Sequence, residues 1–146
     1  MENPLRQSIS ELGDWTWTEP VPTPEDSTVV RTYYRLHQKP IGELELQELK
    51  FLILQNEALE FLVPMALKVL ENDVFIEAEY YEGDLFNALV QINDSPLYWA
   101  SHAHEKRTLI DLYNQQKERL QTFEWPEDMR VEMANRFNDF AKSGAN

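Results

Sequence analysis

Two apolar segments in the middle of the chain constrain the fold more than any other feature of the sequence. Residues 41–56 and 57–72 both carry apolar side chains at the spacing of a helix, including Leu49 and Leu52 in the first segment. Helices joined by so few residues must pack antiparallel, so we expect a helical hairpin that buries most of the aliphatic side chains. Pro64 lies inside the second segment, where it removes a backbone donor and predicts a kink in the helix or a new helix start.

Other stretches also predict helices. Thr23, with a proline after it, is typical of a helix N-terminus, and the helix 84–92 is expected to have Asp84 as its capping residue. The stretch 97–122 is compatible with one long helix or with two. A last helix is expected to start in the sequence WPED, with Pro126 early in its first turn. The residues of this last helix that should face inwards are Val131, Ala134, Phe137 and Ala141.

No stretch of useful length alternates between apolar and polar residues as a strand does, and there are only four glycines. The predicted fold class is therefore all-α, with a single compact domain of about five to six helices. Residues 1–22 lack helical periodicity and are rich in proline towards their end, which predicts an irregular N-terminal arm packed on the body. Residues 23–142 should form the helical domain, and 143–146 a disordered tail.

The composition excludes several classes of protein. A chain of 146 residues with 42% apolar content has the size of one domain. Cysteine is absent, which excludes disulfides, thiolate nucleophiles and thiolate metal sites. The N-terminus lacks the pattern of a signal peptide, and no apolar run reaches the roughly 20 residues of a membrane span. We therefore expect a cytoplasmic protein that does not associate with membranes.

Acidic residues dominate the charge. There are 26 acidic and 13 basic side chains, which give a net charge of -13. Direct binding to nucleic acid is not expected, because such binding depends on lysine and arginine neutralising phosphates. The charge favours a basic protein partner, although acidity that serves only solubility is an equally simple interpretation.

One block concentrates this acidity. No lysine or arginine occurs between Val69 and Glu105, whereas eight acidic residues lie in or at the end of this interval. The block also contains Tyr80, Tyr81 and Trp99, and aromatic residues among charges are typical of protein interfaces.

Catalytic and metal sites find little support in the sequence. The three histidines are His37, His102 and His104, and the last two would lie about 200° apart on a helix, which excludes a shared metal. No serine lies in a nucleophile elbow, and glycine patterns for phosphate binding are missing. We therefore predict a protein that is not an enzyme, with no cofactor and no metal.

The order of motifs in the central part resembles the immunity proteins of contact-dependent growth inhibition (CDI) systems. Members show a K-P-[LI]-x-E-L stretch, a Leu-rich helix with L-I-x-Q, a Y/F-L-V-P-x-A-L segment and then Y-x-G-D-L-L. The similarity covers about residues 8 to 105. The chain departs from the pattern at two positions: Glu45 stands where a Thr or Ser cap is usual, and Phe86 stands where an aliphatic residue is usual. Matching positions are Lys39, Pro40, Glu43, Leu44, Gln55, Phe61, Leu62, Val63, Pro64, Ala66, Leu67, Tyr81, Gly83, Asp84 and Leu85.

The resemblance implies a protein that binds and neutralises the C-terminal toxin domain of a CDI effector, as a monomer in a 1:1 complex. Such toxins are commonly nucleases, and an RNase is the favoured case. An acidic face could then cover the basic active site of the toxin. Two alternatives from other classes are a small acidic helical enzyme and an adaptor subunit of a larger complex.

The motif residues Pro64, Gly83 and Asp84 are expected to be structural, with Gly83 supplying a special backbone conformation and Asp84 a helix cap. A rival contact surface is the N-terminal arm, with Asp14, Trp15, Trp17, Glu19, Glu25 and Asp26. The predicted partner-binding residues are Glu77, Glu79, Tyr80, Glu82, Asp94, Tyr98 and Trp99.

Overall fold

Helices make up 70% of the computed structural model, and the residues that the structure describes, 4–12, 20–92 and 95–142, contain no strand. Eight α-helices and three short 3-10 helices follow one another in this part of the chain. The predicted all-α class is confirmed, whereas the expected number of five to six helices was too low. None of the described helices has the length and apolar character that crossing a membrane requires.

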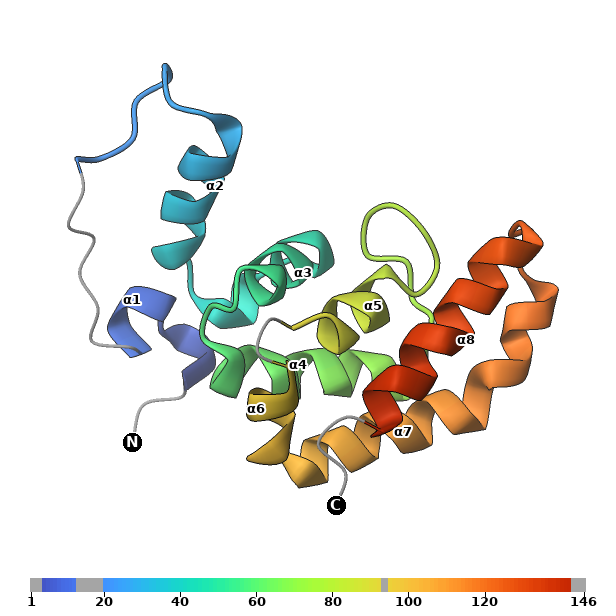
Figure 1. Cartoon of the computed structure of the whole chain (residues 1–146). Helices are drawn as coiled ribbons and strands as arrows, with labels where there is room; N and C mark the ends of the chain where they lie inside the picture. The colour runs from blue at the N-terminus through green and yellow to red at the C-terminus, as the bar shows by residue number, and fades with distance from the viewer. Residues whose placement is uncertain (1–3, 13–19, 93–94, 143–146) are drawn as a thin grey trace.

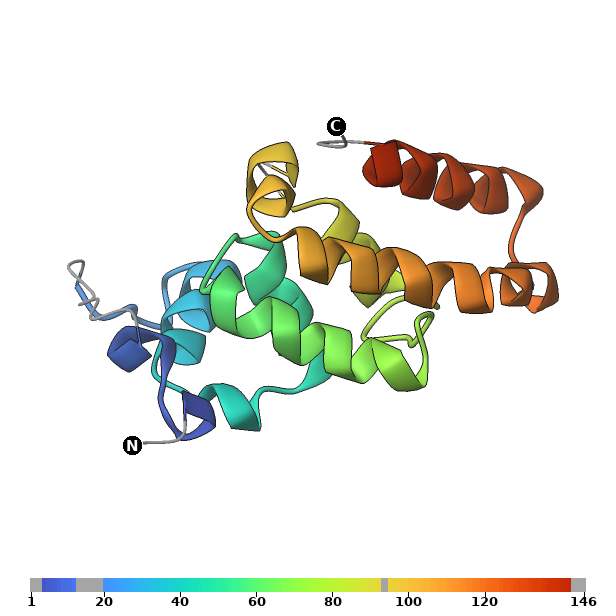
Figure 2. The same ribbon diagram turned by 90° about the horizontal axis from the view of Figure 1, so that it is seen from below.

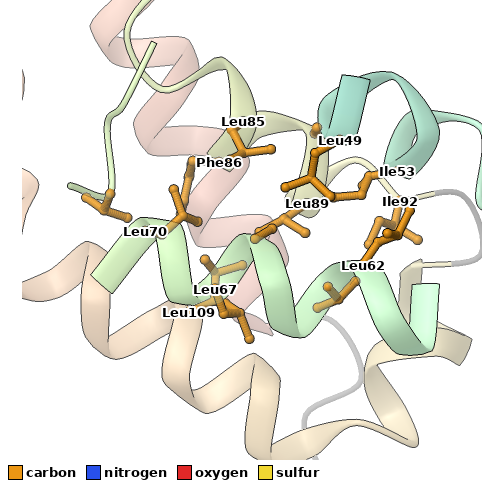
Figure 3. Close-up of a cluster of buried hydrophobic side chains, with 14 of the residues drawn as sticks. Leu49, Ile53, Leu62, Leu67, Leu70, Leu85, Phe86, Leu89, Ile92 and Leu109 are labelled. Carbon is orange, nitrogen blue, oxygen red and sulfur yellow. The ribbon is translucent and has the colours of Figure 1, made fainter. Parts of the chain in front are cut away.

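The two apolar segments form α3 (Leu46–Leu54) and α4 (Leu59–Asn72), which pack against each other at the centre of the molecule (Figure 1). α5 (Asp84–Val90) packs on both of them, and nearly all of its residues are buried. Figure 3 shows the resulting core, in which side chains from α3, α4, α5 and the later helix α7 converge. Its fully buried members include Ile53, Leu62, Leu70, Leu85, Phe86, Leu89 and Leu109.

Pro64 lies within α4, which is a continuous helix from Leu59 onwards, so a new helix start at the proline is wrong. Its ring is exposed, and the backbone hydrogen bond that it cannot donate is lost on the solvent side of the helix. The turn before α4 places Asn56 and Ala58 at positive φ, 60° and 48°, which lets the chain reverse between the two helices within a few residues.

The stretch 97–122 does not form one helix. It divides into α6 (Ser95–Ala100), α7 (Ala103–Gln116) and the 3-10 helix η3 (Lys117–Thr122). α7 packs along α4 and covers the side of the core opposite to α3 and α5 (Figure 2).

The last helix, α8 (Glu127–Lys142), closes the core with aromatic residues. The rings of Phe137 and Tyr113 stack with centroids 3.8 Å apart, and Phe140 meets Trp99 edge to face at 5.3 Å. The inward face is formed by Met133, Phe137 and Phe140. The prediction that Val131 faces inwards was wrong, since 50% of this residue is exposed.

The first described residues form a 3-10 helix, η1 (Pro4–Arg6), and one helical turn, α1 (Ile9–Leu12), so this part of the predicted irregular arm is helical. η1 lies against the 3-10 helix η2 (Ile41–Glu43), and the N–H of Ile41 donates to the carbonyl of Gln7 at 3.0 Å. α1 lies against the next helix, α2 (Thr28–His37).

α2 (Thr28–His37) begins four residues later than predicted, since its cap is Ser27 and not Thr23. The side chain of Ser27 accepts the N–H of Val30 at 3.2 Å and is the actual cap. Thr23 instead belongs to a separate turn, in which its N–H donates to the carboxylate of Asp26 at 2.7 Å.

Candidate functional site

One buried carboxylate fixes the loop that joins α4 to α5. Asp84, which is 3% exposed, is the first residue of α5. Its two oxygens accept backbone N–H bonds of 2.7 to 2.9 Å from Ala78, Glu79 and Tyr80. Burial by itself would raise the pKa of Asp84, but the three N–H groups and the nearby Lys50 outweigh it and hold this pKa below its ordinary value. The loop backbone is thereby held by a carboxylate that is charged at neutral pH.

Lys50 connects the same loop to α3. Its Nζ lies 2.8 Å from a carboxylate oxygen of Glu79 and 3.6 Å from one of Asp84. It also lies 4.2 Å from the centre of the Tyr80 ring, in cation–π geometry. Since Lys50 is only 7% exposed, its ammonium needs these partners, and the loop in turn gains an attachment to the core.

The end of the loop depends on Gly83, which has φ +85° and donates its N–H to the carbonyl of Phe75 at 2.9 Å. A Cβ at this position would lie 3.2 Å from Cε of Met133, and the backbone conformation is one that side chains disfavour. The structure therefore uses Gly83 for its backbone conformation. The cap predicted at Asp84 is wrong, because Gly83 is the N-cap residue and the Asp84 carboxylate turns back to the loop amides.

The fixed loop presents an aromatic ring among acidic residues. Tyr80 is 75% exposed, the largest exposed fraction among the large hydrophobic residues of the described chain. Glu77 is also exposed, and the side chain of Glu79 is 38% exposed although it pairs with Lys50. Glu82 is half-buried and accepts the indole N–H of Trp125 at 3.0 Å, so it supports the loop as well as charging it.

An open groove with a volume of about 300 Å³ lies between α2, α3 and this loop. Tyr80 and Glu79 form its loop side, Phe51 lies on α3, and Val29, which is 58% exposed, lies on α2. The groove thus combines apolar surface with charge at its rim. Its remaining lining residues are Thr28, Thr32, Arg35, Leu36, Gln47 and Glu48.

Not all predicted contact residues lie at this loop. Trp99 is 1% exposed and packs on Phe140, so it belongs to the core and offers no surface to a partner. Tyr98 is half-buried and stacks on His102 at 4.0 Å. It belongs to α6, a helix that lies apart from the loop in Figure 1. Asp94 lies outside the described residues.

The rival surface in the N-terminal arm is described only at its end. Asp14, Trp15, Trp17 and Glu19 lie outside the described residues. Glu25 and Asp26 are exposed in the turn before α2.

Two residues of this region were missed from the sequence. Lys50 is a single lysine within the apolar run of α3, and a charge in such a run is a recognisable sign of a buried ion pair. Phe51 beside it could not be assigned to the groove, because only the tertiary contacts decide which residues of an almost fully buried helix stay accessible.

The described residues contain no group of three or more histidine, cysteine or acidic side chains arranged to hold a metal ion. Glu48 and Asp84 are carboxyl groups in this part of the chain whose pKa clearly departs from its usual value. In both, burial is outweighed by hydrogen bonds and by Lys or Arg partners, and the pKa is lowered. A general acid and base pair would instead need pKa values displaced in opposite directions.

An acidic helical domain that displays an exposed aromatic residue on a rigid acidic loop is the class of protein that this fold and site define. The family model of CDI immunity proteins matches residues 12–109, more than half of the chain, and the chain therefore belongs to this family. Membership implies immunity against a cognate CDI toxin and suggests a non-enzymatic inhibitor. No curated protein and no solved structure gives a match.

Proposed function

We propose that this protein neutralises a nuclease toxin domain, with an RNase as the favoured case, by covering its basic active-site surface with the loop 77–82 and the adjoining groove. The observation that carries the proposal is the exposure of Tyr80 on a loop that a buried charge holds in place. The contact with Lys50 covers only part of the ring, so Tyr80 keeps 75% of its surface in water, and an exposed tyrosine is a preferred anchor of protein interfaces.

Electrostatics bring the partner to this anchor. A net charge of -13 attracts a basic domain over several ångströms, and it raises the association rate more than the final affinity. A nuclease must keep a positive surface to hold phosphates. Carboxylates such as those of Glu77 and Glu79 compete for the same surface, which supports inhibition by occlusion of the active site.

Rigidity contributes to affinity. A loop that orders only on binding would lose conformational entropy at that moment, and this loss would weaken the complex. The bonds from Asp84 to the loop backbone remove this cost, since the free protein already holds the loop in one conformation. The complex is expected to be 1:1 and to form in the cytoplasm, where a delivered nuclease would reach its substrate.

The test is co-expression with the toxin domain encoded beside this gene, followed by binding measurements at several salt concentrations. Wild-type protein should restore growth and inhibit nuclease activity in a salt-sensitive complex. Truncating an interface anchor typically costs about 2 kcal/mol, so Tyr80→Ala should raise Kd roughly 30-fold. Glu77→Lys should slow association, because it reverses an exposed charge on the loop. Among the described residues the side chain of Glu77 makes no ion pair that the reversal would break.

Asp111→Lys is the matched control for the charge reversal. Asp111 is exposed on α7, which lies on the opposite side of the molecule from the loop in Figure 1. Its pair with Arg107, at 3.9 Å between two exposed side chains, contributes little, so its loss should not disturb the comparison. Equal slowing by both reversals would show that only net charge matters and would remove the loop from the interface. If the toxin still kills cells that express wild-type protein, the proposed function itself is refuted.

A further inference from the structure

A second hollow, with a volume of about 200 Å³, lies where the loop meets α8. It is separate from the groove beside α2, and the two share no lining residue. Its walls come from the end of the loop, from α5, from the segment before α8 and from α8 itself. The lining residues are Tyr81, Asn87, Trp125, Met129, Glu132, Met133 and Arg136.

Asn87 carries an unmatched acceptor at this hollow. The residue is 4% exposed, and its Nδ2 donates to the hydroxyl of Tyr81 at 2.8 Å. Its Oδ1 is buried and has no hydrogen-bond partner among the described residues. Buried polar atoms are nearly always paired in folded proteins, so this carbonyl is an unused acceptor that a donor from outside the chain can satisfy.

The rest of the hollow favours a flat cation as that donor. The rings of Tyr81 and Trp125 stand almost perpendicular, 75° apart with centroids at 6.5 Å, and offer aromatic faces that attract positive charge. Glu132 supplies a carboxylate at the hollow, and Glu82 holds the indole N–H of Trp125 at 3.0 Å just beside it. An anionic guest would meet both of these carboxylates.

Glu132 already pairs with a guanidinium of the chain itself. Arg136 donates to a carboxylate oxygen of Glu132 at 2.5 Å, one turn earlier on α8. Its side chain is 40% exposed, so it can move into water and leave Glu132 to an incoming group. Such an exchange keeps the carboxylate paired throughout.

We propose that this hollow receives an arginine side chain of the toxin partner, with Glu132 and the Asn87 carbonyl as acceptors and Trp125 as the stacking surface. The inference rests on the proposed function, since it names a contact within that complex. Tyr80 and the arginine hollow then form two anchors joined by the same rigid loop, because Tyr81 and Tyr80 are adjacent.

The experiment measures the affinity of wild-type protein and three variants for the toxin domain. Met129→Trp fills the hollow, and Glu132→Gln removes its charge without a change of size. Each should raise Kd roughly tenfold or more, as loss of a buried arginine anchor does. Asp139→Asn removes the same single charge from an exposed position of α8 outside the hollow and should change Kd by less than about twofold. Far-ultraviolet circular dichroism and thermal melting confirm that Met129→Trp is folded.

A second measurement tests the chemistry in the free protein. In ¹H–¹⁵N spectra, N-acetyl-arginine amide should shift the Trp125 indole and Asn87 amide signals. N-acetyl-citrulline amide, its uncharged analogue, should leave them unchanged. Equal shifts with both compounds, or none with either, would overturn the cation site.

The outcomes separate the two claims. If wild-type protein binds the toxin and the hollow variants bind as tightly as Asp139→Asn, the arginine hollow is refuted and the proposed function stands. If wild-type protein forms no complex, the proposed function fails, and the arginine contact fails with it.

Discussion

Replacing Asp84 by asparagine tests the physical basis of the candidate site most directly. The substitution preserves shape and leaves one carbonyl oxygen. If that oxygen takes the place of Oδ2, it still accepts the N–H bonds of Glu79 and Tyr80. The new amide nitrogen then takes the place of Oδ1 and faces the N–H of Ala78, and this hydrogen bond is lost because both groups are donors. Lys50 also loses one of its two carboxylate partners.

The magnitude follows from these contacts. A hydrogen bond to a charged group contributes about 1.5 to 3 kcal/mol, roughly twice a neutral one, so one lost bond and two weakened bonds should lower the free energy of unfolding by about 3 kcal/mol. Urea denaturation measures this loss. Hydrogen exchange should show in addition that the amides of Ala78, Glu79 and Tyr80 lose protection, with Asp139→Asn as a control that changes neither quantity by much.

The pH dependence of stability independently tests the direction of the pKa shift of Asp84. The folded pKa of Asp84 lies below its ordinary value, so its stabilising contribution is fully present above the unfolded pKa of about 4 and is lost as the pH falls through the folded pKa. The difference in stability between wild type and Asp84→Asn should therefore shrink in acid. A loss below 1 kcal/mol at neutral pH, or unchanged protection of the three amides, would refute the claim that this carboxylate holds the loop.

Two further substitutions, and one control, probe the loop and the core. Gly83→Ala should lower the free energy of unfolding by about 2 kcal/mol, because φ is +85° and the added Cβ would lie 3.2 Å from Met133. Thermal unfolding measures the change, and no change would mean that the turn adopts another conformation. Leu70→Ala, at a core position with no exposed surface, should cost about 2 to 5 kcal/mol in urea denaturation, whereas Leu97→Ala, at a residue 73% exposed, should cost less than about 0.5 kcal/mol. Similar costs for the two leucines would contradict the assignment of the core.

Local patterns predicted the helices where one signal dominated. The dense apolar spacing of 41–72 could only be buried as helices, and the structure confirms α3 and α4 there. The start of α2 was misplaced because Thr23 and Ser27 are both competent caps, and the sequence does not say that Asp26 closes a separate turn on Thr23. Helix starts depend on such competition between neighbouring side chains, which a pattern of apolar residues does not report.

The candidate site was predicted in part for a related reason. Acidic and aromatic residues in one block indicated a surface, and Tyr80 and Glu77 are indeed exposed. Trp99 has the same local signature but lies in the core, because its partner Phe140 comes from a helix about forty residues further along the chain. Similarly, a Gly-Asp pair before a helix predicts a cap, and only the folded path of 75–83 brings three amides to Asp84 instead.

These contacts separate what fixes the loop from what the loop displays. Asp84 binds backbone N–H groups, which every residue except proline offers, so the loop conformation depends little on the side chains at 78–80. Gly83 likewise acts through its backbone. The scaffold can therefore keep its glycine and aspartate while the displayed side chains change. Under the proposed function, this division would let the specificity for a toxin reside in side chains whose replacement does not disturb the fold.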